Sequence, residues 1–455
     1  MRRQRRSGTI IILLVFTALI GGLFFLYNST MFERVPPTIE LAKTLHWNLK
    51  KPITLKVSDN SGIKFVRVTL SDGQNNIVLA KKIYEIAEQE VTLDVMFPKT
   101  GFFSKKNVFD LVVETVDGSK WNFFGGNQSV QKSLLHVDTR KPEVYILTNS
   151  YKITKGGVGT IIFKANDENL KELYIETNIG HTFYPTPFYK EGYYMALVAW
   201  PSDEPTFRAD VVALDYAGNK TKNRVKFYLQ GKKYRESRIA LKEKFLNGKI
   251  SDLVEEYYSD KVGVSSLEKF KLVNETLRQG NEEIIEKMTK KVPLESIATF
   301  DIKPFYPLKN GAAVASFGDH RFYQYEKDAV SESYHLGLDL ASTAQADVVS
   351  SNKGVVVYAE NNGIYGKNII IDHGLGIYSL YGHCSAFTVE KGDIVNAGEV
   401  IAKTGLTGLA LGDHLHFGIL VQGVEVRPDE WMDASWMKDN LFKVMDDAKK
   451  IIDHK

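Results

Sequence analysis

Apolar and polar residues follow three patterns along the chain, and each predicts a different kind of structure. An uncharged run from Gly8 to Tyr27 is long enough to cross a bilayer as a helix, which takes about 20 residues. From Pro36 to about Leu229, apolar and polar residues alternate in short runs, as in half-buried strands. From about Phe300 to Trp436, strand-like runs return between glycine turns. The chain is therefore expected to be mainly β, behind one N-terminal helix.

The residues that flank the apolar run predict where the chain lies. Four arginines, at positions 2, 3, 5 and 6, precede the run and favour an N-terminus in the cytoplasm. A cleaved signal peptide is the alternative, but its apolar region is typically about 7 to 15 residues and ends at small residues. Bulky residues, Phe24 to Tyr27, stand at that place. Residues 1–30 are expected to form a cytoplasmic tip and a transmembrane anchor. This makes a single-pass protein of the inner (cytoplasmic) membrane, with most of the chain in the periplasm.

The alternating region contains an internal repeat of about 100 residues. The corresponding segments are Ile53–Asp59 with Ile161–Asp167, and Phe109–Gly118 with Phe207–Asn219. A repeat made only of strands predicts two tandem β-sandwiches, at residues 31–139 and 140–231. The D-x-A-G-N ending of the second repeat resembles bacterial immunoglobulin-like (Ig-like) domains. Such domains are expected here to act as spacers, with binding of glycan or a partner as the alternative.

Residues 232–299 differ in composition and predict a short helical connector. The segment is rich in Glu and Lys, and Ser265 with Glu268 fits a capping box. Gly280 is expected to interrupt the helix. Apolar residues at helical spacing are Phe270, Val273, Leu277, Ile284 and Met288. This stripe is expected to pack on the neighbouring domain or, alternatively, to act as a regulatory arm that covers a groove or pairs with another protein.

The last domain, residues 300–436, is expected to be an antiparallel β-sheet or sandwich, followed by a helical tail at residues 437–455. Its strands are joined by short turns, as in hairpins. The predicted strand runs are Gly354–Ala359, Lys367–Gly374, Ile377–His383 and Gly398–Gly405.

Charge and cysteine content exclude several classes of function. The formal net charge is only +3 over 455 residues, and the basic residues are not gathered with aromatics, so nucleic acid is not an expected partner. A single cysteine, Cys384, excludes an internal disulfide and a cysteine-rich metal cluster. Seven of the ten histidines lie after residue 300. Histidine and carboxylate groups of the last domain must therefore supply the chemistry.

Three short clusters of the last domain can build a zinc site. They read H-L-G-L-D from His335, Y-G-H-C-S around His383, and D-H-L-H-F-G around His414 and His416. His335 and Asp339 offer one nitrogen and one oxygen ligand. On a strand, His414 and His416 point to one face, and either can supply a third ligand. The fourth position is left open for water, as in catalytic zinc sites. The sequence contains no H-E-x-x-H motif, so histidine must also handle protons.

In this order and with these connections, the clusters resemble the lysostaphin/LytM-type zinc metallopeptidases, which cleave peptide bonds in bacterial peptidoglycan and have the duplicated hybrid motif fold. The resemblance covers roughly the final third of the chain. Cys384 stands where the family usually has an aliphatic residue, and Asp413 where it often has proline. The resemblance implies Zn²⁺ ligands His335, Asp339 and His416, and catalytic histidines His383 and His414.

The sequence therefore predicts a zinc-dependent endopeptidase that hydrolyses peptide stems or cross-links of peptidoglycan, with cell wall, division or elongation proteins as candidate partners. One alternative is a non-catalytic scaffold of the same fold that activates another wall hydrolase. Another is an adhesin that binds through residues 31–231. Cys384 is expected to be a small buried hydrophobe and not a nucleophile. The histidines expected to have no role in the site are His46, His136, His181, His320, His373 and His454.

Overall fold

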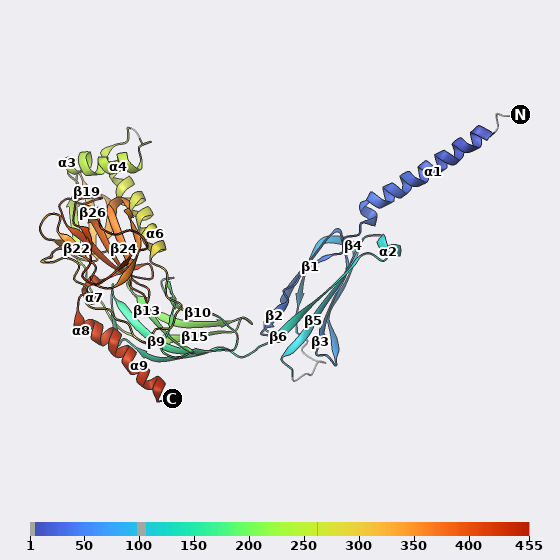
Figure 1. Ribbon diagram of the computed structural model, residues 1–455, viewed down its shortest axis with the longest axis horizontal. Helices are drawn as coiled ribbons and strands as arrows, with labels where there is room; N and C mark the ends of the chain where they lie inside the picture. Colours follow the sequence, from blue (N-terminus) through green and yellow to red (C-terminus); the bar gives the residue numbers. More distant parts are fainter. Residues whose placement is uncertain (1–4, 98–105, 262, 455) are drawn as a thin grey trace. The chain divides into compact units, whose positions relative to one another are not determined.

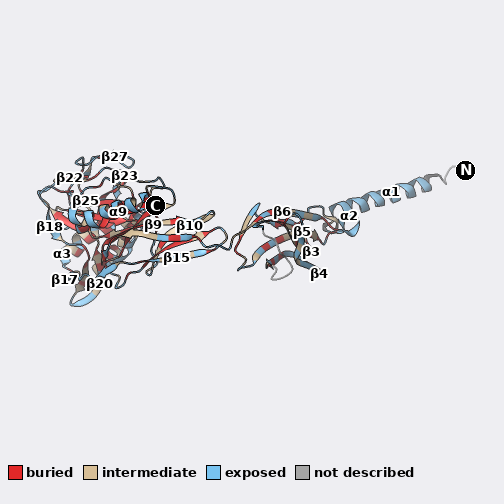
Figure 2. Ribbon diagram, turned by 90° about the horizontal axis from the view of Figure 1, so that it is seen from below, coloured by how far each residue is buried: buried red, intermediate tan, exposed pale blue. Residues whose placement is uncertain are grey.

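The computed structural model describes residues 5–97, 106–261 and 263–454 of the chain, and strands predominate among them, as the alternating pattern predicts (Figure 1). The chain divides into two compact units, each with its own buried residues (Figure 2). The first unit runs from Met1 to Lys141 and includes the short segments 169–171 and 214–220, and the second holds the rest of the chain.

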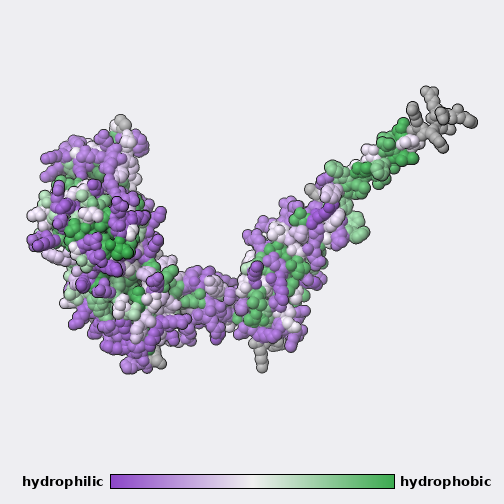
Figure 3. Space-filling model, in the orientation of Figure 1, coloured by the Kyte–Doolittle hydropathy of each residue, from purple (hydrophilic) through white to green (hydrophobic). Residues whose placement is uncertain are grey.

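Helix α1 (Arg5–Asn28) is the predicted N-terminal apolar helix. Its span Gly8–Asn28 has 21 residues and a mean hydropathy of 2.7, and all of these residues are exposed. Figure 3 shows it as a largely hydrophobic rod. The helix is long and apolar enough to cross a membrane, a property that signal sequences share.

The strands of the first unit form one connected sheet. The strands are β1 (Thr38–Glu40), β2 (Thr44–Trp47), β3 (Ile53–Ser71), β4 (Asn76–Val95), β5 (Val108–Asp117) and β6 (Gln128–Val137). Their order is β1-β3-β5-β6-β2, with β4 paired to β3. This differs from the two separate sheets of the predicted sandwich. Strands β3 and β4 are 19 and 20 residues long and shift register between Ser58 and Ile63, an irregularity that bends a sheet. The immunoglobulin-like assignment stays a prediction.

The second repeat forms two sheets of four strands each, as a sandwich requires. One sheet has the order β12-β13-β9-β7, from β7 (Glu143–Asn149), β9 (Val158–Asn166), β12 (Thr186–Pro187) and β13 (Tyr193–Ala199). The other has the order β11-β10-β14-β15, from β10 (Leu170–Thr177), β11 (Thr182–Phe183), β14 (Ala209–Asp215) and β15 (Lys220–Val225). Strands β8 (Lys152–Thr154) and β16 (Tyr228–Gln230) form a separate parallel pair.

The connector is helical over most of its length but begins with a strand. Strand β17 (Glu236–Ala240) pairs in parallel with β19 (Asp319–Tyr325), so the connector contributes to a sheet of the last domain. The helices that follow are α3 (Glu243–Phe245), α4 (Ser251–Tyr257), α5 (Ser266–Lys271) and α6 (Arg278–Met288), with π-helical turns at Leu246–Ile250 and Leu272–Leu277. Ser265 and Glu268 make the predicted capping box.

The expected interruption at Gly280 is wrong, because this residue lies inside α6. An interior glycine costs a helix only about 1 kcal/mol relative to alanine, and burial of an apolar stripe outweighs that cost. Of the predicted stripe, Phe270, Val273 and Leu277 share one core with Tyr323 and Tyr378 of the last domain, and Met288 packs against it. Ile284 is instead 38% exposed, and its neighbour Ile285 is buried in that core. The connector therefore packs on the neighbouring domain, which was the first of the two expectations for it.

The last domain is built on an eight-stranded sheet of order β18-β21-β29-β25-β24-β23-β27, with β30 paired to β29. Its strands are β18 (Ala312–Ala315), β21 (Leu338–Ala341), β23 (Gly354–Asn361), β24 (Lys367–Asp372), β25 (Ile377–Cys384), β27 (Ile394–Val395), β29 (Leu415–Val421) and β30 (Val424–Val426). Two three-stranded sheets flank it: β17-β19-β20, with β20 (Asp328–His335), and β22-β28-β26, from β22 (Asp347–Val349), β26 (Ala386–Phe387) and β28 (Val400–Lys403).

The tail is helical, as predicted, and returns to the second repeat. From residue 437 it consists of the end of α8 (Ala434–Met437), a π-helical turn (Lys438–Phe442) and α9 (Lys443–Asp453), and α7 (Pro428–Trp431) lies before it in the last domain. Thr148 Oγ1 donates a hydrogen bond to the Val444 carbonyl at 3.0 Å, and Ser150 Oγ donates one to the Asn440 carbonyl at 2.9 Å. The second repeat, connector, last domain and tail thus pack together as the second unit.

Candidate metal centre

Strand pairing places two of the predicted ligands next to each other. Asp339 on β21 lies directly opposite His416 on β29 in an antiparallel ladder, and Gly382 of β25 is the neighbour of His416 on its other side. Directly opposite residues project to the same face of a sheet. His335 ends β20 and reaches the same face after a short turn through Gly337.

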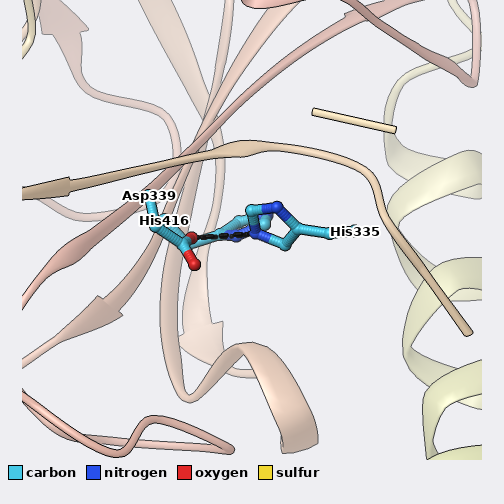
Figure 4. Close-up of side chains that lie close together, drawn as sticks. All are labelled: His335, Asp339 and His416. Carbon is cyan, nitrogen blue, oxygen red and sulfur yellow. Dashed lines mark hydrogen bonds and ion pairs between the residues drawn. The ribbon is translucent and has the colours of Figure 1, made fainter. Parts of the chain in front are cut away.

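The side chains of His335, Asp339 and His416 converge on one point (Figure 4). Asp339 Oδ1 lies 2.9 Å from His335 Nε2 and 2.9 Å from His416 Nδ1, and the two nitrogens are 3.2 Å apart. All three residues are buried. Two imidazole nitrogens and a carboxylate oxygen gathered in this way are a ligand set that zinc prefers.

The hydrogen bonds of this cluster leave a lone pair that suits a cation. His335 Nδ1 lies 2.9 Å from the Ser316 carbonyl, which can only accept, so Nδ1 carries the proton. In the neutral ring, Nε2 then has a lone pair that can bind a metal, and only the protonated ring donates a hydrogen bond from Nε2 to Asp339 Oδ1. Burial alone raises the pKa of Asp339, but hydrogen bonds and charge interactions with His335 and His416 lower it well below its usual range. Asp339 therefore stays ionised, and a metal ion satisfies both groups at once.

Gly337 is a site residue that sequence reasoning did not single out. A Cβ atom at this position would lie 2.5 Å from Cε1 and Nε2 of the His416 ring, so only glycine leaves room for the imidazole. The glycine inside H-L-G-L-D was the available signal. Because Gly337 has no side chain, the chain can turn tightly between the two predicted ligands His335 and Asp339 and pass close to the His416 ring.

The other two predicted site residues, His383 and His414, lie beside the cluster. Their ring centroids are 4.8 Å apart, and His414 Nε2 is 3.7 Å from Asp339 Oδ2. His383 Nδ1 bonds the Thr407 carbonyl at 2.9 Å, and His414 Nδ1 bonds the Gly412 carbonyl at 2.7 Å. Both Nδ1 atoms must therefore donate, so each neutral ring keeps Nε2 free to accept a proton. The structure brings all five predicted residues together.

The backbone at His383 is held in an uncommon conformation. Its φ of 62° is left-handed, which costs energy for a residue other than glycine and recurs at functional sites. Burial lowers the pKa of His383 to about 3, so the imidazole is neutral near pH 7. Burial also lowers the pKa of His416. The neutral form is the one that can accept a proton or bind a metal.

The two departures from the family pattern have structural explanations. Cys384 is fully buried, as expected, and burial raises the pKa of its thiol to about 12, which suppresses the thiolate. Asp413 accepts hydrogen bonds from Thr404 Oγ1 at 2.5 Å and from the Gln345 backbone N–H at 3.1 Å. This carboxylate therefore fastens the loop that leads into His414.

A groove passes the metal centre, and one of its walls is rich in arginine. These residues are Arg235, Arg238, Arg278 and Arg321. Arg278 is held in place by the side-chain and backbone oxygens of Asn274, at 3.0 and 3.2 Å, and Arg321 lies 3.2 Å from Asp319. Sequence reasoning missed this wall because its members come from the connector and from β19, outside the histidine clusters, and only folding unites them.

Histidines predicted to lie outside the site have other partners. His320 Nε2 lies 3.1 Å from Glu332. His373 Nδ1 lies 2.8 Å from the Lys353 carbonyl, and His373 Nε2 lies 2.7 Å from Ser379 Oγ. Burial lowers the pKa of His373 to about 4. His373 is thus a half-buried residue with both ring nitrogens hydrogen-bonded.

The low pKa of His373 predicts a loss of stability in acid. Between its ordinary pKa of 6.5 and about 4, the unfolded chain binds a proton that the folded chain does not, so the free energy of unfolding falls as the pH decreases through this range. The loss attributable to this residue is about 1 to 3 kcal/mol. In the metal-free protein, His373→Gln should show a smaller drop in unfolding free energy between pH 7 and 4.5 than the unchanged chain. An equal decrease in unfolding free energy for the variant and the unchanged chain would show that other groups cause the acid sensitivity.

Comparisons with known proteins match this part of the chain. Residues 333–428 match peptidase family M23. The DD-carboxypeptidase/endopeptidase Mpg of Neisseria meningitidis serogroup B is 38% identical over 94 residues, which are 21% of this chain and 22% of that protein. The peptidoglycan DD-endopeptidase ShyA of Vibrio cholerae is 33% identical over 131 residues, 29% of each chain.

Stage II sporulation protein Q of Bacillus subtilis is 32% identical over 140 residues, 29% of this chain and 50% of that protein. The chain thus spans between about a fifth and a half of the length of these relatives. The family match covers the strands that carry the histidine clusters. Residues 333–428 are therefore a peptidase family M23 domain, as the three clusters predict.

Proposed function

We propose that this chain is a membrane-anchored, zinc-dependent endopeptidase that hydrolyses peptide stems or cross-links of peptidoglycan. The observation that carries the proposal is the complete set of five residues. His335, Asp339 and His416 converge as a ligand set, and His383 and His414 stand beside them with Nε2 free. The similarity of this domain to Mpg and ShyA, whose names describe peptidases and a peptidoglycan endopeptidase, supports the same substrate class.

Each side chain of the site has a role that its contacts support. His335, Asp339 and His416 would hold zinc, which would polarise a scissile carbonyl and lower the pKa of water to about 7. The Ser316 carbonyl keeps the His335 proton on Nδ1, so Nε2 is presented to the metal position. The Nε2 atoms of His383 and His414 are the two positions that can take a proton from the nucleophile and return it to the leaving amine.

The arginine wall favours a substrate that carries carboxylates. Arg235 and Arg238 flank the groove from the connector side, and Arg278 is fixed by Asn274 so that its guanidinium is already ordered. A guanidinium binds a carboxylate through two parallel hydrogen bonds. Peptide carboxylates can therefore bind at Arg235, Arg238 and Arg278, although Glu236, Asp319 and Asp413 also line the groove.

The proposed location follows from the first helix. The arginines before the apolar span favour a cytoplasmic N-terminus, and the 21-residue span then crosses the inner membrane once. The M23 domain is placed in the periplasm, where peptidoglycan is accessible. The β repeats between the anchor and the groove act as the spacer.

Digestion of peptidoglycan tests the proposal directly. The purified full-length chain in mild detergent, supplied with zinc, is incubated with peptidoglycan, and the released fragments are identified by mass. We expect new amino and carboxyl termini at one type of peptide bond. Intact peptidoglycan after incubation with protein that holds one zinc per chain would overturn the enzymatic assignment.

Removing His383 should separate catalysis from metal binding. His383→Gln takes away one of the two free Nε2 atoms but none of the three proposed ligands. Zinc content is expected to stay at one per chain, while kcat falls by about 10² to 10⁴, the usual contribution of a general acid–base group. Metal analysis and turnover on a soluble cross-linked peptide provide the measurement. A variant with unchanged kcat would remove His383 from the proposed chemistry.

A non-catalytic scaffold is the second candidate. It is favoured by the similarity to stage II sporulation protein Q, whose name describes no hydrolase. On this reading the M23 domain docks on another protein and activates a wall hydrolase. The five intact site residues favour the enzyme, and zinc-loaded protein without cleavage would favour the scaffold.

A further inference from the structure

An exposed aromatic turn stands out on the first unit. Helix α2 (Trp121–Phe124) is a single turn whose aromatic side chains all face solvent. Phe123 is 99% exposed, Phe124 71% and Trp121 41%. Burial of phenyl and indole rings is favourable, so a soluble surface rarely presents three of them together. Such a patch marks a surface that meets an apolar partner.

The backbone of this turn keeps the rings outside. Asn122, Phe123 and Phe124 have φ values of 51°, 55° and 70°, in the left-handed region that residues other than glycine rarely adopt. This conformation is unfavourable for each of the three residues. Backbone hydrogen bonds from Phe124 to Lys120 and from Gly126 to Trp121 nevertheless close the turn, at 3.2 Å each. The exposed rings are thus held by a defined structure.

The turn is fastened to the residues that follow α1. The Lys120 backbone N–H donates to the Met31 carbonyl at 2.8 Å, and Ser119 Oγ donates to the Glu33 carbonyl at 2.8 Å. Asn127 Nδ2 also donates to Glu33, to both its carbonyl and Oε1 at 3.0 Å. Since the apolar span of α1 ends at Asn28, these contacts tie the turn within a few residues of the membrane boundary.

A cation and further aromatic rings complete the patch. The Arg34 guanidinium lies 4.1 Å from the centroid of the Tyr27 ring and 4.3 Å from that of Trp121. Figure 1 shows α2 near the C-terminal end of α1. Tryptophan and tyrosine gather at the boundary between hydrocarbon and water, and arginine next to them meets lipid phosphates. The combination suits a phospholipid surface better than a protein groove.

We propose that Trp121, Phe123 and Phe124 insert into the interfacial layer of the bilayer that α1 spans. The first β unit is then held at the membrane by two contacts, the helix and the aromatic turn, and does not swing freely on a single tether. This inference rests on the proposed membrane anchor and is independent of the proposed peptidase activity.

A fluorescent label beside the turn tests the insertion. Lys120→Cys carries an environment-sensitive dye in the full-length chain, reconstituted into phospholipid vesicles. The natural Cys384 is fully buried, so it is protected from labelling under native conditions. The dye at residue 120 should be quenched by lipid-linked quenchers and shielded several-fold from aqueous iodide. Val78→Cys, at a 51% exposed position on β4 opposite Thr69 and toward the end of β3 that lies away from Asp117, is the matched control and should behave in the opposite way.

A second variant removes the rings and keeps the turn. Phe123→Asn with Phe124→Asn is expected to fold normally, because asparagine tolerates left-handed φ, and unchanged thermal unfolding checks this. In that background the dye at residue 120 should become accessible to iodide. Equal iodide access in both backgrounds, in protein that floats with the vesicles, would overturn the inference. The inference would also be overturned if the dye were shielded from iodide but not quenched by lipid-linked quenchers, because this would show that a protein covers the turn. Protein that does not float would overturn the anchor, and with it this inference, without bearing on peptidase activity.

Discussion

Replacing His416 with alanine is expected to abolish zinc binding and, with it, peptide cleavage. The change removes one of two nitrogen ligands and leaves the buried Asp339 carboxylate with a single imidazole partner at 2.9 Å, that of His335. Two ligands do not hold zinc tightly in a site that needs three protein donors. Metal analysis should therefore find about one zinc per chain in the unchanged protein and almost none in the variant.

His320→Ala is the matched control for this change. His320 belongs to the same domain and pairs with Glu332 at 3.1 Å, outside the convergent cluster. Its removal should leave zinc content and cleavage unchanged. Retention of one zinc per chain by the His416 variant would show that the metal binds elsewhere.

Replacing Phe270 with alanine should cost about 3 to 5 kcal/mol of stability, the usual cost of deleting a buried phenyl ring. Phe270 is fully buried, and its ring packs edge-to-face on that of Tyr323, with 4.9 Å between the ring centroids. Its loss opens a cavity between the connector and β19. Denaturant unfolding of the second unit, followed by tryptophan fluorescence, measures the change.

Ile284→Ala on α6 is the control for this prediction. Ile284 is 38% exposed, so its truncation should cost less than about 1 kcal/mol. A similarly small decrease in the free energy of unfolding for Phe270→Ala would mean that the connector is a loosely attached arm. The expected loss of about 3 to 5 kcal/mol would show that the connector belongs to the core of the peptidase domain. A fragment that starts at Phe300 would then lack part of that core.

Much of the fold follows from local patterns. Alternation predicted the mainly β chain, and the apolar run predicted α1, because both patterns depend on neighbours along the sequence. The Ser265 and Glu268 capping box was readable for the same reason. The five site residues were found because the histidine clusters keep their order and connections, and strand pairing then brings them together.

Features that depend on contacts between distant parts of the chain could not be predicted from the sequence. The helix continues through Gly280 because its apolar stripe is buried against another domain, which local propensity does not contain. The single sheet of the first unit depends on how β3 and β4 pair along their length. The arginine wall and β17 combine segments from the connector and from β19 that share no motif. The exposure of Phe123 depends on a turn that is fastened to residues far away in the sequence.

A zinc titration of the metal-depleted full-length chain tests the central claim most directly. Bound zinc and the rate of cleavage of a soluble cross-linked stem peptide are measured in the same samples. The account predicts no cleavage without metal and a rate that rises in proportion to bound zinc until one ion per chain is reached. Cleavage that persists in the metal-free chain, or one bound zinc without cleavage, would contradict it.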